Sequence, residues 1–458
     1  MPRYVDQKAK LPLLQQILEN ETDEQHPLTP KPIPMRRDMT LLPLSAARYR
    51  THRLTALLAV PLRESTAAGI AILPDLLSRR TRRYPTEAAL CEKLDMLYGA
   101  SLACGTFRVG AWQVLQVSIE YLQARLTPDR TDLTDECVEL LLDTLTAPLL
   151  DESGAFYPED FAREQRCLQE RLQSRLNDKR LYARRRAMAL LCPGEPYAVD
   201  PLGTPETVAA LTPAAAAEAY RRLLCGARIR LLYQGDADVD ALIRRIEHLF
   251  AALPERRGAQ PMPGPVFTLR QSEETEHMDI DQAKLVLGFR IAATEPDGPV
   301  YAARLMNALL GGGPTSLLFT HVREERSLCY YCHSAYSALS GTLLIDSGID
   351  PAAADTAKAE ILRQLEAIRQ GQFSDDELEA ARRALIQQFA TADGSTAARE
   401  EHYGTQLLFD RCVTPEQYGA ALREVTRDEV CRVARSVHFD TTYLLCPKDR
   451  PQGGEVTG

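Results

Sequence analysis

The chain has 458 residues, a net charge of −9 and a hydrophobic fraction of 45%, an ordinary globular composition with length enough for about two to three domains. The acidic balance argues against a nucleic-acid partner, and no apolar run approaches the roughly 18 residues of a membrane span. The first residues lack the apolar core of a secretory signal, and the 11 cysteines are scattered. We therefore expect reduced thiols and a cytoplasmic location.

Residues 1–38 are predicted to form an N-terminal arm. The segment is rich in proline, and its stretch HPLTPKPIP is typical of extended rather than helical chain. The favoured interpretation is an arm that packs on its own domain or stays disordered. Docking of the short apolar piece LPLLQQIL on a partner is the alternative.

Residues 39–253 are predicted to form a first domain of mixed strands and helices. Alternating and apolar runs predict strands at 40–44, 54–62, 101–109, 112–122 and 229–236. Helical spacing predicts helices at 65–81, 87–99, 132–145 and 239–253, and one long helical stretch at 158–191. Predicted N-caps are Thr86, Thr204 and Thr212.

A segment rich in Pro, Gly and charge at 254–276 is predicted to link this domain to a second one at 277–450. The second half repeats the first. FYPEDFAREQRCLQER matches FSDDELEAARRALIQQ, TPETVAAL matches TPEQYGAAL, and LDMLYGAS matches ERSLCYYC ahead of two alternating strands. Three matches in the same order predict a duplicated α+β unit rather than a doubly wound sheet. Capping boxes are predicted at Ser374–Glu377, Thr414–Gln417 and Thr426–Glu429.

The most informative stretch runs from Gly311 to Tyr331. Its glycines and proline end one helix, and Thr315 or Ser316 is a predicted cap for the next. Arg323 and Tyr330 stand seven residues apart around the end of that helix. A guanidinium and a phenol placed there can hold a peptide carbonyl or carboxylate. The alternative is a surface Arg and a half-buried Tyr.

This stretch, GGGPTSLLFTHVREERSLCY, resembles the R-E-E-x-x-L-x-Y signature of the pitrilysin-type (insulinase-type, inverzincin) peptidases. The resemblance covers nearly all of residues 39–448. It implies two homologous α/β-layer domains that form a clamshell around a chamber. It also implies that Arg323 and Tyr330 are substrate-binding residues, which hold the peptide backbone near a catalytic zinc. Ser327 stands where many members of the family have Gly.

Zinc binding in this family requires H-x-x-E-H on one helix and a further Glu ligand on a later helix. The two His bind zinc, and the first Glu takes a proton from the zinc-bound water. The matching positions here are Ala71, Pro74 and Asp75, and the later ligand position falls on Arg171. No histidine stands close enough in sequence for a shifted alignment to restore the motif. We therefore predict no catalytic residue and no metal site on this chain.

An oxygen-only cation site made by Asp75, Glu164 and Glu170 is disfavoured, because calcium and magnesium need about six ligands. Solvated or salt-bridged helix carboxylates are the favoured interpretation. The basic clusters at 79–83 and 184–186 are interpreted as solvated helix ends, with an acidic substrate or subunit as the alternative.

Cys329-x-x-Cys332-His333 has the pattern of haem c attachment. No export signal accompanies it, and a redox pair or a zinc ribbon would need a different context. The segment is expected to be a strand, on which residues 329 and 332 would point to opposite faces. Buried or edge thiols are therefore the favoured interpretation.

The two halves differ in what they retain. The half that should hold zinc lacks its ligands, whereas the other half keeps Arg323 and Tyr330. By resemblance to two-subunit members, and to zinc-less bacterial YfmF-like members associated with elongation factor P modification, we predict a non-catalytic subunit. It would form a heterodimer with a zinc-bearing homologue and bind the peptide substrate, with zinc on the partner. The alternatives are a stand-alone peptide-binding or scaffold protein, and a peptidase using other chemistry, for which His321 and His333 offer no recognised triad.

Overall fold

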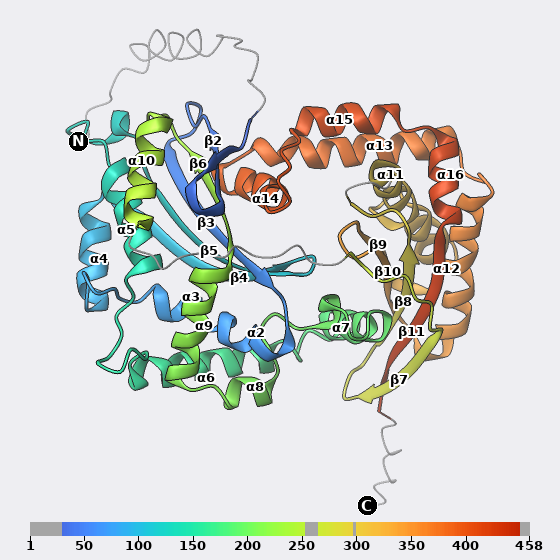
Figure 1. Ribbon diagram of the computed structural model, residues 1–458. Helices are drawn as coiled ribbons and strands as arrows, with labels where there is room; N and C mark the ends of the chain where they lie inside the picture. Colours follow the sequence, from blue (N-terminus) through green and yellow to red (C-terminus); the bar gives the residue numbers. More distant parts are fainter. Residues whose placement is uncertain (1–29, 252–263, 296–298, 449–458) are drawn as a thin grey trace, which may run out of the picture.

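The computed structural model describes residues 30–251, 264–295 and 299–448, which form two β-sheets side by side (Figure 1). The first sheet has the strand order β1-β2-β6-β3-β5-β4. Its strands are β1 Ile33–Met35, β2 Met39–Leu44, β3 Thr51–Pro61, β4 Ser101–Val109, β5 Trp112–Leu122 and β6 Arg228–Gln234. The second sheet has the order β7-β11-β8-β10-β9. Its strands are β7 Ser272–Met278, β8 Ala283–Ile291, β9 Cys329–Ser337, β10 Thr342–Ile349 and β11 Val437–Pro447.

The two sheets share one topology. In the first, β2 pairs in parallel with β6, and β3, β5 and β4 follow as antiparallel neighbours. In the second, β7 pairs in parallel with β11, and β8, β10 and β9 follow in the same way. A parallel pair at the same place in two otherwise antiparallel sheets is not expected by chance. The predicted α+β fold of two homologous domains is confirmed.

Helices of the first half pack their apolar sides on one face of the first sheet. Leu54 and Leu115 of the sheet and Leu141 of a covering helix are fully buried in one core, each contributing roughly 1.5–3 kcal/mol of burial. The predicted caps at Thr86, Thr204 and Thr212 each accept a hydrogen bond from a backbone N–H of the first turn. The helices are α2 Glu64–Ala71, α3 Leu73–Leu77, α4 Glu87–Met96, α5 Thr134–Thr146, α6 Pro158–Ser174, α8 Pro205–Ala209, α9 Pro213–Gly226 and α10 Val239–Phe250.

Helices of the second half cover the corresponding face of the second sheet. Leu287, Leu305 and Ile361 are fully buried in this second core. The three predicted capping boxes, which begin at Ser374, Thr414 and Thr426, are confirmed. The helices are α11 Val300–Gly311, the π-helix η5 Leu318–Glu325, α12 Ala354–Arg369, α13 Asp375–Ala390, α15 Pro415–Glu424 and α16 Arg427–Arg435.

Two helices are exchanged between the halves. Helix α7, Lys179–Leu191, follows α6 in the chain but packs against the second sheet, where Ala183, Ala187 and Leu191 meet Tyr443 in one buried cluster. Helix α14, Thr396–Leu407, follows α13 but packs against the first sheet. The duplication makes α7 and α14 equivalent, so the exchange is reciprocal (Figure 1). It gives each sheet a cover for its second face.

Several predicted elements differ from the observed ones. The predicted helix 65–81 is two short helices, because the chain turns at Ile72 and Pro74 stands in the first turn of α3. The predicted stretch 158–191 is also two helices, since Asp178 caps a new one and α7 leaves in another direction. The helix after Gly313 is a π-helix without a side-chain cap, and Ser316 bonds back to the Gly313 carbonyl instead.

Two predicted connecting segments contain strands. Most of the predicted arm, 1–29, lies outside the described residues, but its end forms β1, which pairs with β2. Strand β7 occupies the end of the segment predicted as a linker, 254–276. Both strands lie at a sheet edge.

Candidate functional site

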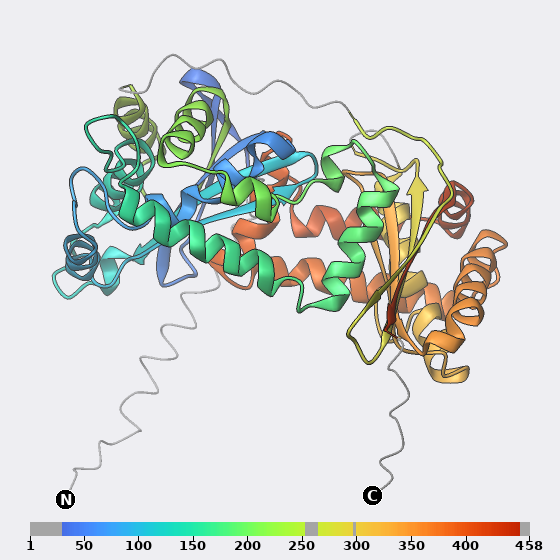
Figure 2. The ribbon, with the colours of Figure 1, turned by 90° about the horizontal axis from the view of Figure 1, so that it is seen from below.

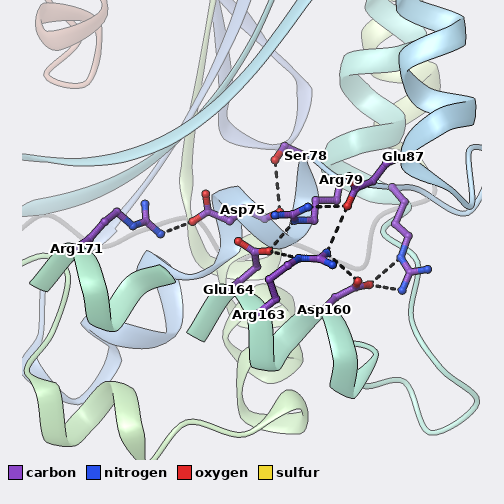
Figure 3. A network of polar contacts seen from close by, with 9 residues as sticks. Asp75, Ser78, Arg79, Glu87, Asp160, Arg163, Glu164 and Arg171 are labelled. Atoms are coloured by element: carbon purple, nitrogen blue, oxygen red, sulfur yellow. Dashed lines mark hydrogen bonds and ion pairs between the residues drawn. The ribbon is translucent and has the colours of Figure 1, made fainter. Parts of the chain in front are cut away.

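The positions that correspond to the zinc ligands of the family lie together in the structure. Asp75 is in α3 and Arg171 is in α6, and their side chains form an ion pair (Figure 3). These are the positions expected for the second His and the later Glu ligand. Ala71 and Pro74 are buried. An Asp–Arg pair therefore stands where two metal ligands would face each other.

The rest of this region is a network of ion pairs between α6 and the chain around α3 (Figure 3). Glu164 is buried, and one of its oxygens lies 2.6 Å from Arg79 Nε and 3.0 Å from Arg163 Nε. Arg79 also contacts Glu87 at 2.6 Å, and Arg80 pairs with Asp160. Each carboxylate has a guanidinium partner, which is the condition for burying charge. Asp75 and Glu164 are thus salt-bridged, as one form of the prediction holds, and Glu170 is exposed.

The carboxylates of this region are already paired with arginines and are not free to bind a cation. In the described part of the chain, no group of three or more His, Cys, Asp or Glu side chains is arranged to hold a metal ion. Surface pockets of about 280 Å³ and about 310 Å³ lie on either side of Asp75. The second is lined by Arg171 and by Gly105 and Thr106 of the edge strand β4.

A double-mutant cycle with Asp75→Asn and Arg171→Gln is expected to give a coupling free energy of about 0.5 kcal/mol in urea unfolding. Both side chains are about a third or more exposed, 34% and 43%, and solvent screens such pairs. The control cycle combines Asp75→Asn with Arg166→Gln and should show no coupling. Arg166 is an exposed arginine of α6, the helix that carries Arg171. Equal coupling in the two cycles would contradict a specific Asp75–Arg171 contact.

Arg323 lies near the end of η5. Its guanidinium stacks 4.7 Å from the centre of the Phe319 ring, and its Nε lies 3.5 Å from Glu324. The side chain is 41% exposed. π-Helices are rare and are frequently found at functional sites, and this one ends three residues before β9.

Tyr330 stands on a β-bulge at the start of β9. Gly348 of β10 pairs with Tyr331, and the next residue, Ile349, pairs with Cys329, so Tyr330 is the extra residue. It is 68% exposed. A bulge redirects a side chain and is over-represented next to active sites. The bulge leaves the phenol exposed to solvent.

The bulge also changes the placement of the two cysteines beside it. The prediction that residues 329 and 332 point to opposite faces is wrong, because the extra residue brings both thiols into the same buried core. A hydrogen bond between the thiols lowers the pKa of Cys329 and raises that of Cys332. The positive charge of Arg323 also lowers the pKa of Cys329. The thiols are buried, as the favoured interpretation holds.

The two histidines of this region pair with carboxylates. His321 Nδ1 lies 2.8 Å from Glu325 on the same helix. His333 Nδ1 lies 3.9 Å from Asp346, and burial lowers the pKa of His333. Neither arrangement is a nucleophile–base pair of the kind that covalent peptidases use.

The basic cluster 184–186 lies in the middle of α7 rather than at a helix end, which corrects the sequence-based interpretation, and its arginines are ion-paired although 30–43% exposed. Arg184 pairs with Asp346 of the second sheet at 3.1 Å, and Arg186 pairs with Glu274 of β7. The cluster 79–83 is similarly paired, as described above for Arg79 and Arg80. Sequence reasoning missed the partners because most of them are distant in sequence, and those of Arg184 and Arg186 lie in the other half. The local signal for the start of α7 was Asn177-Asp178, which is typical of a helix start.

Comparison with known proteins supports the family resemblance described from the sequence. The family model described as "Peptidase M16 inactive domain" matches residues 210–385. The "Probable inactive metalloprotease YmfF" of Bacillus subtilis is 27% identical over 398 residues, which cover 87% of this chain and 93% of that protein. An "Uncharacterized zinc protease" of Rickettsia felis is 23% identical over 331 residues, 69% of this chain and 75% of the relative.

Solved structures show the same architecture. A conserved protein from Enterococcus faecalis superposes with a TM-score of 0.84 at 25% identity, over 93% of this chain and 100% of the other. A peptidase M16 inactive domain from Pseudomonas fluorescens gives 0.76 at 17% identity, over 92% of this chain and 98% of the other.

The fold and the ion-paired zinc positions together define a metallopeptidase-like protein without the family's zinc ligands. The chain is similar to M16-type metalloproteases, one of which is named as probably inactive, and the resemblance predicted from its sequence is confirmed. Every helix in the described part is too short or too polar to span a bilayer.

Proposed function

We propose that this chain is the substrate-holding subunit of a two-subunit metallopeptidase, paired with a zinc-bearing M16-type homologue that supplies the chemistry. The observation that carries the proposal is the asymmetry between the halves. The zinc-ligand positions are closed by the Asp75–Arg171 pair, whereas Tyr330 stands exposed on a bulge seven residues after the half-exposed Arg323. A phenol and a guanidinium are donors for a peptide carbonyl.

The exchange of helices supports a partner subunit. Arg290 of β8 is buried and donates to the carbonyl of Leu191 at the end of α7, 2.7 Å away. Thr396 of α14 accepts a 2.7 Å bond from Gln234 of β6. Opening or closing one half against the other would break such buried bonds, each worth roughly 0.5–1.5 kcal/mol. A chamber around the substrate therefore forms more readily between this chain and a second one.

The test is isolation of the protein, tagged at its C-terminus, under mild conditions from its own cells. We expect a partner of similar size that carries H-x-x-E-H, with about one zinc ion per pair. The pair should hydrolyse oligopeptides in the cytoplasm, and chelation of zinc should stop hydrolysis without releasing peptide from this chain. Protein that arrives alone and zinc-free would overturn the proposal and favour a stand-alone peptide-binding or scaffold role.

A further inference from the structure

Five arginines follow one another on α6, on α7 and in the turn between them. We call them the arginine row, and they are Arg171, Arg175, Arg180, Arg184 and Arg185. Arg175 and Arg185 share Asp200, at 2.8 Å and 3.3 Å. Arg180 and Arg184 share Asp346. Two arginines of the row therefore share each of Asp200 and Asp346, whereas Arg171 has Asp75 to itself.

The row connects the two parts of the candidate site. At one end, Arg171 and Arg175 line the pocket of about 310 Å³ beside Asp75 and the edge strand β4. At the other end, the Arg180 guanidinium stacks 4.4 Å from the centre of the Tyr331 ring, next to Tyr330 on β9. Figure 2 shows α6 and α7, in green, crossing from the first half to the second on the near face.

The exposed charge of the row is positive. The side chains of Asp200 and Asp346 are 22% and 1% exposed, whereas the five arginines are 30–43% exposed. Asp178 adds a negative charge where it caps α7, but Lys284 lies 5.7 Å from the Tyr331 ring on the same side. The row therefore presents cations to solvent on a chain whose net charge is −9.

Neighbouring groups do not cancel this charge. Burial lowers the pKa of His333, and Arg180 and Arg184 lower it further against the opposing effect of Asp346, so His333 is neutral at pH 7. Burial also lowers the pKa of Arg185, and Arg175 and Arg108 add to this while Asp200 and Asp178 oppose it. The guanidinium groups are crowded and share too few carboxylates.

We propose that the arginine row binds acidic side chains of the peptide that Arg323 and Tyr330 hold, so that the substrates are acidic peptides; this inference rests on the function proposed above. Guanidinium groups bind carboxylates through two parallel hydrogen bonds. A peptide that extends from Tyr330 along α7 toward β4 passes each arginine of the row. Because its aspartates are already shared, a substrate carboxylate can bind without displacing them.

The experiment uses the full-length chain and three fluorescent peptides of one length, built from serine and glycine with glutamate, glutamine or lysine at alternate positions. Fluorescence anisotropy should show the glutamate peptide binding about tenfold tighter than the glutamine peptide, and the lysine peptide binding most weakly. The preference should shrink at high salt, which screens exposed charges. This salt series needs no variant.

The double variant Arg175→Gln, Arg184→Gln should reduce the preference to about twofold. It leaves Arg185 on Asp200 and Arg180 on Asp346, so the fold keeps both ion pairs. The matched control is Arg221→Gln, Arg222→Gln on α9, which removes the same charge from side chains that are 50% and 72% exposed. The control should keep the full preference.

The possible failures are distinct. If the glutamate and glutamine peptides bind equally and Tyr330→Ala abolishes both, the row inference is overturned and the proposed function stands. If no peptide binds the chain, both are overturned. If the double variant weakens pairing with the zinc-bearing subunit and leaves the peptide preference intact, the row belongs to the subunit interface and the substrate assignment is overturned.

Discussion

The Arg323→Ala chain, assembled with its zinc-bearing partner, is expected to turn over peptide about 100-fold more slowly than the unaltered pair. The proposed role of Arg323 is to donate to a substrate carbonyl at the reacting bond, and loss of one such donor typically has an effect of this size. The guanidinium is 41% exposed and its nearest carboxylate, on Glu324, is 3.5 Å away. It is therefore available to a substrate. The measurement is kcat/KM for one peptide at a saturating concentration of the zinc-bearing subunit.

The control for this experiment lies three residues further on. Arg326 is 51% exposed and pairs with Glu360 at 3.2 Å, and Arg363 also holds that carboxylate. Arg326→Ala should change turnover less than about twofold. Size-exclusion chromatography should show that both variants still pair with the zinc-bearing subunit. Equal turnover by the two variants would remove the proposed role of Arg323.

Arg290→Ala is expected to lower the free energy of unfolding by about 3–5 kcal/mol, because it leaves the Glu195 carboxylate buried without its partner. The Arg290 side chain is 2% exposed and that of Glu195 is 12% exposed. The substitution also removes the hydrogen bond that Arg290 donates to the Leu191 carbonyl at the end of α7. The contact joins the second sheet to the exchanged helix. Urea unfolding followed by circular dichroism measures the change.

Two controls separate this ion pair from general loss of an arginine. Arg222→Ala removes a side chain that is 72% exposed and pairs only with Glu218 on its own helix, so about 0.5 kcal/mol or less is expected. The double variant Arg290→Met, Glu195→Leu removes both charges and should regain much of the stability. If Arg290→Ala destabilised no more than Arg222→Ala, the buried pair would not stabilise the exchanged helix.

Local chemistry made much of the fold predictable. Thr204 and Thr212, each followed by proline, mark helix starts whose hydrogen bonds close within three residues. Alternating strands such as 101–109 and 112–122 pair as neighbours along the chain. The duplication was visible because equivalent helices keep the same apolar positions, and because Thr204 and Thr414 cap equivalent helices. These features depend on contacts that are short in sequence.

Features that depend on distant contacts could not be predicted. Nothing in α7 itself tells which sheet it will cover, since Ala183 and Ala187 would suit either one. The bulge at Tyr330 depends on the register of β9 against β10, which a single strand does not encode. For the candidate site, the resemblance to the family placed Asp75 and Arg171 at the ligand positions, but their ion pair became visible only in the structure.

The reciprocal exchange of α7 and α14 is the pattern of a domain-swapped dimer contained in one polypeptide. An ancestral chain of half this length would have covered the second face of its sheet by associating with a second copy, with each copy giving its helix to the other. Fusion of the two copies replaces that association by an intramolecular one, at a high effective concentration. Once joined, the two copies are free to diverge, because assembly no longer requires them to be identical. A half without the helix of the other leaves one face of its sheet open to water, so neither half is expected to be stable as a separate fragment.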